Sequence, residues 1–185
     1  MTIEKKHKSK FGKDVVNVIR TAMRNNIELT NIADNKANVL LTLNALMITL
    51  LAPVVINNMD AIKQYDLGIP LAIMVITSCL TIFISVLVLI PRGFGDKKKS
   101  IPYSNHGSPF FFGNFYHMKH DDFQEYFKDV VAKSGDLHSH ITEDLFYLGT
   151  ILGQKMTLIK WAFRIFLVGF FASIILTTIF LFFFE

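Results

Sequence analysis

Cysteine is nearly absent from this sequence of 185 residues: the only one is Cys79, which lies inside an apolar block. A single cysteine excludes a disulfide within the chain and a zinc site built on thiolates. Proline and glycine are missing between Asp14 and Ala52, so nothing there interrupts a helix. Residues 1–25 are polar and basic without an apolar core, so we expect no cleavable signal peptide.

Catalytic motifs are missing as well. The sequence contains no glycine-rich phosphate loop, and its Ser, His and Asp residues match no catalytic-triad motif. The acid pair Asp121–Asp122 falls where a helix is expected to start, and acids there usually stabilise the helix N-terminus. The pair Glu143–Asp144 is likewise expected to have no catalytic role. We therefore predict no enzyme and no metal centre. Four histidines match no strong zinc signature and are expected at solvated positions: His117, His120, His138 and His140.

Apolar residues are what the sequence has in excess. They make up 51% of the chain, and the mean hydropathy is +0.39. They gather into blocks within 37–56, 68–90 and 161–184, and each block has about the 20 residues needed to cross a hydrocarbon core of ~30 Å. The composition predicts a mainly α membrane protein with three transmembrane helices.

The periodicity between these blocks predicts the domain organisation. The first and third transmembrane helices are expected to extend into a cytoplasmic helical bundle. Within it we expect a helix over 121–133, a helix from near Leu137 into the third span, and a short aromatic segment, 109–116, as a strand or a groove insertion. The expected parts are a basic tail at 1–13, a long helix at 14–56 ending as the first span, an external loop at 57–67, a second span at 68–90, a cytoplasmic region at 91–160 and a third span at 161–184.

The distribution of basic residues predicts the orientation. The net charge is +4, with seven Lys and Arg residues before Asn25 and a further group from Arg92 to Lys99, whereas the loop between the first two spans holds only Lys63. Because cytoplasmic loops are enriched in Lys and Arg, we expect a cytoplasmic N-terminus and a C-terminus outside. The basic residues beside the spans are expected to contact membrane lipids, and we expect no nucleic-acid polymer as a partner.

Small polar residues recur every three or four positions at the first span, so they share one helix face. One interpretation is that these residues line a pore or contact a neighbouring protomer. The other is that they form hydrogen bonds between helices of the bundle, with the threonines bonding to carbonyls of their own helix. Asn44 lies off this face and needs its own partner. Asp34 and Lys36 stand at the mouth of the span, where charges are usually paired or functional. The stripe consists of Asn31, Asn35, Asn38, Thr42, Ala45 and Thr49.

The segment Asn31 to Asn44 (NIADNKANVLLTLN) resembles the transmembrane effector of the Pycsar bacterial antiphage system. The resemblance covers nearly the whole chain, although Met156 stands where an aromatic residue is expected. Its motif positions are Asp34, Lys36, Asn44 and Asp144, and the first motif is the more specific part. It continues in order through Leu89-Ile-Pro91-Arg92, Phe111-Phe-Gly113-Asn-Phe115, Asp122-Phe123, Asp144-Leu-Phe-Tyr147-Leu-Gly149 and Leu152-Gly-Gln-Lys155.

This resemblance implies a role. In that system a cyclase makes cCMP or cUMP on infection, and the membrane effector senses the nucleotide and impairs the bacterial inner membrane, so that the cell dies or stops growing. It implies a cyclic nucleotide as the signal ligand, no further cofactor, a cognate cyclase, and region 91–160 as the sensor. Because three helices cannot enclose a wide pore, we expect a homo-oligomer.

A cyclic phosphate favours Arg or Lys, and a base favours an aromatic face. For each basic candidate the alternative is a role in topology or lipid contact. A different function also stays open: an oligomeric adaptor, or a toxin-like protein controlled by a protein partner, that senses no nucleotide. The ligand candidates are Arg20, Arg24, Lys36, Arg92, Lys155, Arg164, Phe115 and Tyr147.

Overall fold

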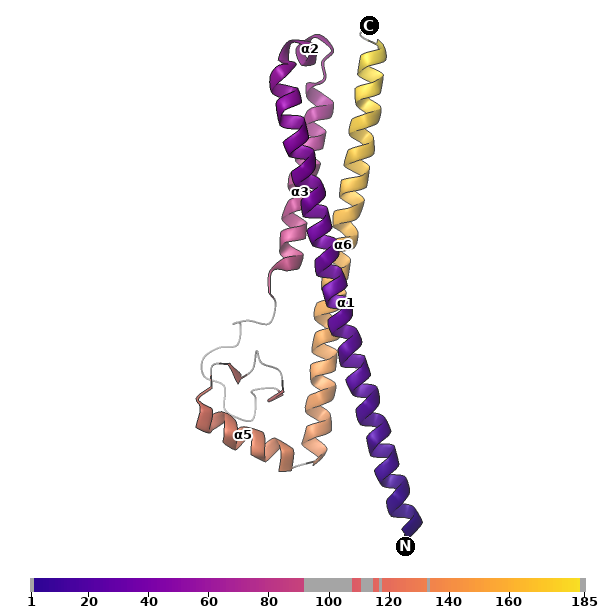
Figure 1. Ribbon diagram of the computed structural model, residues 1–185, viewed down its shortest axis with the longest axis vertical. Helices are drawn as coiled ribbons and strands as arrows, with labels where there is room; N and C mark the ends of the chain where they lie inside the picture. The colour runs from indigo at the N-terminus through magenta and orange to yellow at the C-terminus, as the bar shows by residue number, and fades with distance from the viewer. Residues whose placement is uncertain (1, 92–107, 111–114, 117, 133, 184–185) are drawn as a thin grey trace. The chain divides into compact units, whose positions relative to one another are not determined.

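The computed structural model describes residues 2–91, 108–110, 115–116, 118–132 and 134–183, with only the backbone for 2–13 and 134–138. These described residues form helices and no strand, which confirms the mainly α fold. The helices are α1 (Thr2–Asn57), α2 (Met59–Gln64), α3 (Gly68–Leu89), α5 (His120–Ala132) and α6 (Ser134–Phe183), labelled in Figure 1.

Three of these helices are long and apolar enough to cross a membrane, over 14–57, 68–89 and 139–183. The 56 residues of α1 extend for about 84 Å and the 50 residues of α6 for about 75 Å, at 1.5 Å per residue. Both lengths exceed a hydrocarbon core of ~30 Å by a wide margin. The first and third spanning helices therefore continue far beyond the membrane, as the sequence predicts.

The helix boundaries differ from the expected ones in a few places. The backbone of residues 2–13, expected as a basic tail, continues α1. Helix α5 begins at His120 and α6 at Ser134, before the expected start near Leu137. The loop 57–67 contains the short helix α2, and the chain then turns through Asp66, whose φ of 54° is tolerated because Asp adopts the left-handed region more readily than most residues.

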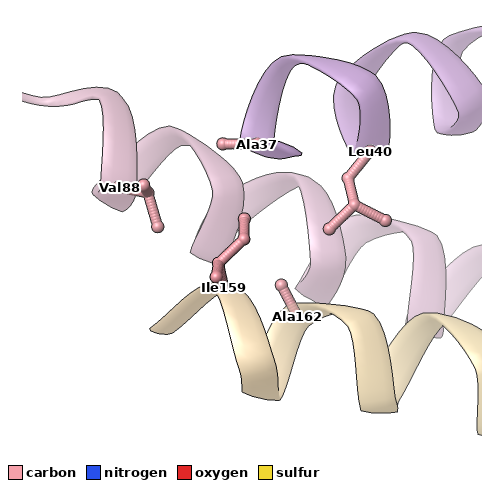
Figure 2. Close-up of a cluster of buried hydrophobic side chains, with 5 residues drawn as sticks. All are labelled: Ala37, Leu40, Val88, Ile159 and Ala162. Carbon is pink, nitrogen blue, oxygen red and sulfur yellow. The ribbon is translucent and has the colours of Figure 1, made fainter. Parts of the chain in front are cut away.

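The chain divides into two compact units, which we describe separately. The membrane unit comprises Thr30–Ile90 and Gln154–Glu185. Its core is a cluster of five buried side chains that point toward one another from three helices (Figure 2). Ala37 and Leu40 come from α1, Val88 from α3, and Ile159 and Ala162 from α6. Two alanines in the cluster allow the helix backbones to approach closely, as is usual where membrane helices pack.

The second unit, which we call the sensor unit after the role that the sequence resemblance implies, comprises Met1–Leu29 and Pro91–Gly153. Its amphipathic helix α5 buries Tyr126 and Val130, one turn apart on the same face. Phe110 packs edge-on against Phe127 with ring centroids 5.7 Å apart, and Phe115 lies 4.8 Å from Phe123. The described parts of the aromatic segment, 109–110 and 115–116, therefore pack on α5 and include no strand.

Candidate functional site

The most distinctive polar contact of the membrane unit joins α1 to α6. The Lys155 ammonium donates to Asp34 Oδ1 at 2.6 Å. The Lys155 side chain is only 8% exposed, whereas that of Asp34 is 32% exposed. The ammonium is therefore the more deeply buried partner, and it depends on Asp34 for its counter-charge.

Local sequence explains how this ion pair forms. Asp34 lies three residues before Ala37 on α1, and Lys155 lies four residues before Ile159 on α6, so both charges stand about one turn from the apolar core cluster. Ala33, beside Asp34, is fully buried. The long lysine stem packs on apolar neighbours while its ammonium reaches the carboxylate.

A second set of polar groups lies buried between the spanning helices. Ser78, Thr81 and Ser85 follow one another at steps of three and four residues, so they share one face of α3, and each is at most 4% exposed. On α6, the Ser173 hydroxyl donates to the Pro70 carbonyl at 2.9 Å. Sequence reasoning missed this face, although its spacing was visible in the second span.

Asn44 is the buried polar residue of α1. It is 0% exposed, and its amide nitrogen donates to the Leu40 carbonyl at 2.8 Å. Its Oδ1 has no hydrogen-bond partner among the described residues, and the same holds for the fully buried Ser85 Oγ. A polar atom buried without a hydrogen-bond partner lowers the free energy of unfolding, and apolar side chains at these two positions would avoid that cost.

Unlike Asn44, the predicted polar stripe of α1 lies on an exposed surface of the membrane unit. Thr42 and Thr49 donate to the carbonyls of Asn38 and Ala45 in the preceding turn, at 2.9 and 2.8 Å. The stripe is therefore not covered by α3 or α6, and its threonines bond back to their own helix. All of its members are exposed: Asn31, Asn35, Asn38, Thr42, Ala45 and Thr49.

The sensor unit has its own buried polar contact, which sequence reasoning also missed. The Ser108 hydroxyl donates to Asp144 Oδ2 at 2.5 Å, and the Phe110 N–H donates to Ser108 Oγ at 3.2 Å. Asp144 is 6% exposed and Ser108 1% exposed, so the contact ties segment 108–110 to α6. One turn before Asp144, His140 has a buried Nδ1 with no hydrogen-bond partner among the described residues.

Asp144 lies 17 residues, or about 25 Å along α6, before the start of the predicted third span at Trp161. Burial governs the ionisation of its carboxyl and of the neighbouring Tyr126. Burial raises the pKa of the Asp144 carboxyl, and the Glu143 carboxylate adds to the rise, although the Ser108 hydroxyl and His140 oppose it. Burial likewise raises the pKa of Tyr126, helped by Glu143 and Asp144. Folding therefore favours the neutral forms of both groups.

The raised pKa of Asp144 gives a pH-dependent stability. Since the folded chain holds this proton more tightly than the unfolded chain, the contribution is present below the ordinary carboxyl pKa of 3.8 and is lost as the pH rises through the raised value. Asp144→Asn keeps an acceptor for Ser108 but does not titrate, so the acid-side stabilisation should disappear. Amide hydrogen exchange of 139–152 in the full-length protein, corrected for intrinsic rates, measures this.

The matched control for that measurement is Asp121→Asn, because Asp121 is an exposed carboxyl on α5. It should leave the pH dependence of the exchange unchanged. An Asp144→Asn protein whose protection still falls with rising pH as in the unsubstituted chain would contradict the assignment.

The ligand candidates divide between the two units. In the membrane unit, Lys155 is paired with Asp34, Lys36 is exposed, and the exposed Arg164 guanidinium lies 5.3 Å from the Trp161 ring centroid, a cation–π distance. The remaining candidates belong to the sensor unit or lie outside the described residues, as Arg92 does. Arg20 and Tyr147 are exposed, Arg24 pairs with Glu28 at 3.0 Å, and Phe115 packs on Phe123.

Metal-ligating side chains do not converge in the part of the chain that the structure describes. Among those residues no group of three His, Cys, Asp or Glu side chains is placed to hold an ion. His117 lies outside the described residues, and nothing is described of the His138 side chain.

Together these features define a membrane protein with three spanning helices, in which an ion pair joins the two helices that continue into a separate unit. Residues 18–183 match the family described as the Pycsar effector protein domain. The match covers nearly the whole chain, and the chain belongs to this family, which confirms the resemblance seen in the sequence. It is an antiphage membrane effector. No curated protein and no solved structure matches the chain.

Proposed function

We propose that this effector senses a cyclic nucleotide, with cCMP and cUMP the first candidates, and responds by permeabilising the bacterial inner membrane, which kills the cell or arrests its growth. The observation that carries the proposal is that α1 and α6 each run unbroken through both units and are joined by the Asp34–Lys155 ion pair. A helix that continues into the membrane transmits a displacement at its far end to its spanning part.

The ion pair stands at the right place along the chain to act as a lock. Asp34 follows the point where α1 enters the membrane unit at Thr30, and Lys155 follows the point where α6 enters it at Gln154. A displacement of the sensor-unit ends of the two helices would first strain this contact. Separating the two charges near an apolar core would cost free energy. The pair therefore favours the arrangement of α1 and α6 in which it is formed over one in which it is broken, and the switch has two states.

Ligand recognition is proposed on the cytoplasmic side, with the N-terminus cytoplasmic and the C-terminus periplasmic. Basic residues would hold the cyclic phosphate, and an aromatic side chain would stack on the base. Lys155 is the least available of them, since its ammonium is already paired. The proposed ligand residues are Arg20, Arg24, Lys36, Arg92 and Arg164 for the phosphate, with Phe115 and Tyr147 for the base.

Permeabilisation is proposed to need several copies. Three helices enclose no wide pore, and the uncovered stripe of α1 leaves Asn38, Thr42 and Thr49 facing away from α3 and α6. Asparagine side chains carry both donors and acceptors, so two identical stripes can pair. The same stripe is thus available to a neighbouring copy within the membrane.

Dye release from liposomes that contain the purified full-length protein tests the proposal, with cCMP, cUMP and other cyclic nucleotides added singly. One nucleotide is expected to cause release, and calorimetry should show binding of the same nucleotide to the protein in micelles. Lys119→Gln is a control for the role of surface charge, because Lys119 is exposed and is not among the proposed ligand residues. The absence of both dye release and binding with every nucleotide would contradict the proposal.

A further inference from the structure

Outside one apolar cluster, most of the buried side chains of the membrane unit are polar. Along α3 the buried positions run from Pro70 through Ser78, Thr81 and Ser85 to Val88, all on one face. The 18 steps from Pro70 to Val88 cover about 27 Å, nearly the ~30 Å of a hydrocarbon core. Every position between Pro70 and Val88 in this series carries a hydroxyl.

The register of the neighbouring helices places further polar groups along the same line. Ser173 donates to the Pro70 carbonyl, so α6 supplies a hydroxyl at the α2 end of the unit. On α1, Asn44 lies four residues beyond Leu40 toward that end and is fully buried. Each of the three helices therefore contributes buried oxygen or nitrogen atoms to the interior.

The apolar cluster is bracketed by these groups. On one side of it, about one turn away along α1 and α3, lie Asn44 and Ser85, whose Oδ1 and Oγ have no hydrogen-bond partner among the described residues. On the other side, about one turn away along α1 and α6, lies the Asp34–Lys155 pair. The cluster itself is Ala37, Leu40, Val88, Ile159 and Ala162, drawn in Figure 2.

We propose that this interior row, opened in each copy when the activated oligomer rearranges, lines the path that water and ions take, and that the apolar cluster is its gate. An apolar constriction between polar segments excludes water while it is closed and admits water once it widens or becomes polar. The unpartnered atoms of Asn44 and Ser85 are groups that entering water would satisfy. The exposed stripe of α1 is then a contact between copies and does not line the path.

This inference deepens the proposed permeabilisation, on which it rests, and it names residues for a separate test. A serine in place of Leu40 puts a hydroxyl inside the gate. Liposomes that contain full-length Leu40→Ser protein are expected to leak without nucleotide, as much as the unsubstituted protein leaks at saturating nucleotide. Val88→Ser, on a different helix of the same cluster, is expected to do the same, which guards against one variant failing to fold.

Two controls separate polarity from damage. Leu40→Ala loosens the packing but keeps the gate apolar, so it should not leak without nucleotide. Leu46→Ser adds the same hydroxyl to an α1 position that is 54% exposed, and it should not leak either. Adding Asn44→Leu and Ser85→Ala to the Leu40→Ser protein removes the unpartnered polar atoms, and the leakage should fall to that of Leu40→Ala.

The outcomes distinguish this inference from the proposed function. The proposed gate is overturned if liposomes with folded Leu40→Ser and Val88→Ser proteins do not leak. It is also overturned if Leu40→Ala or Leu46→Ser causes as much leakage as Leu40→Ser. Failure of every nucleotide to cause release from the unsubstituted protein overturns only nucleotide sensing, because the Leu40→Ser measurement uses no nucleotide. Retained helical circular dichroism after reconstitution identifies the folded variants.

Discussion

Asp34→Asn is expected to destabilise the membrane unit by about 3 kcal/mol, the low end of the range for removing one partner of a buried ion pair. The substitution leaves the Lys155 ammonium, whose side chain is only 8% exposed, without a counter-charge. Lys155→Met should cost less, because the methionine fills the volume of the lysine stem and the remaining carboxylate is 32% exposed and keeps part of its hydration. Thermal unfolding in micelles, followed by circular dichroism and by the fluorescence of Trp161, measures both.

The double substitution Asp34→Leu with Lys155→Met gives the sharper result. Replacing a whole buried ion pair by apolar side chains is often neutral or stabilising, so the double variant should unfold at or above the temperature of the unsubstituted protein. If the pair acts as the lock, that stable protein should still respond differently to nucleotide in the release assay. A double variant as unstable as Asp34→Asn would show that the pair is not an isolated couple.

The exposed Arg24–Glu28 pair on α1 is the matched control for these measurements. Its partners are four residues apart, at 3.0 Å, with side chains 78% and 57% exposed. Exposed pairs of this kind contribute about 0.3–0.5 kcal/mol, so Glu28→Gln should shift the unfolding temperature only slightly. A shift as large as that of Asp34→Asn would contradict the argument from burial.

Gly169→Ala is expected to weaken the packing of α3 on α6 by about 1–3 kcal/mol, the usual cost of overpacking. A Cβ at position 169 would overlap the Thr77 side chain. That side chain cannot turn away easily, because it is β-branched and its hydroxyl bonds to Ile73 and Met74 carbonyls at 2.9 and 3.0 Å. The helices would have to separate, which would also stretch the Ser173 bond to Pro70. Unfolding in micelles measures the loss.

Two other glycines of α6 provide the control. A Cβ at Gly149 or Gly153 would meet nothing within 4 Å, so alanine there should leave stability unchanged or raise it by about 0.5–1 kcal/mol through helix propensity. Thr77→Gly should recover part of the loss caused by Gly169→Ala, since it vacates the space that the new methyl group needs. Equal effects of alanine at 153 and 169 would rule out a close approach at 169.

The helices themselves were largely predictable. Long apolar runs predicted the spanning parts of α1, α3 and α6, and the absence of glycine and proline from Asp14 to Ala52 predicted the continuity of α1, because both are local properties of the sequence. The acids at the start of α5 predicted its N-terminus to within one residue. The helical backbone of 2–13 and the short helix α2 were not expected, since charged or short polar segments carry no strong periodic signal.

The partners of the polar residues were much less predictable. Asp34 and Lys155 were both singled out in the sequence, but 121 positions separate them, and only the packing of α6 on α1 joins them. The stripe of α1 was recognised as one face, whereas its exposure follows from where α3 and α6 lie. Ser108 and the hydroxyl face of α3 escaped notice because isolated serines and threonines are unremarkable until they are buried.

The sequence by itself determined the class of this protein: three spans, two helices longer than the membrane is thick, and membership of the Pycsar effector family, whose match covers residues 18–183. These features depend on the order of residues along single helices. The tertiary structure alone decided which charges pair, which polar atoms are buried without partners, and that an apolar cluster interrupts them. Such features depend on contacts between distant segments, and the burial that makes them costly exists only after the helices pack.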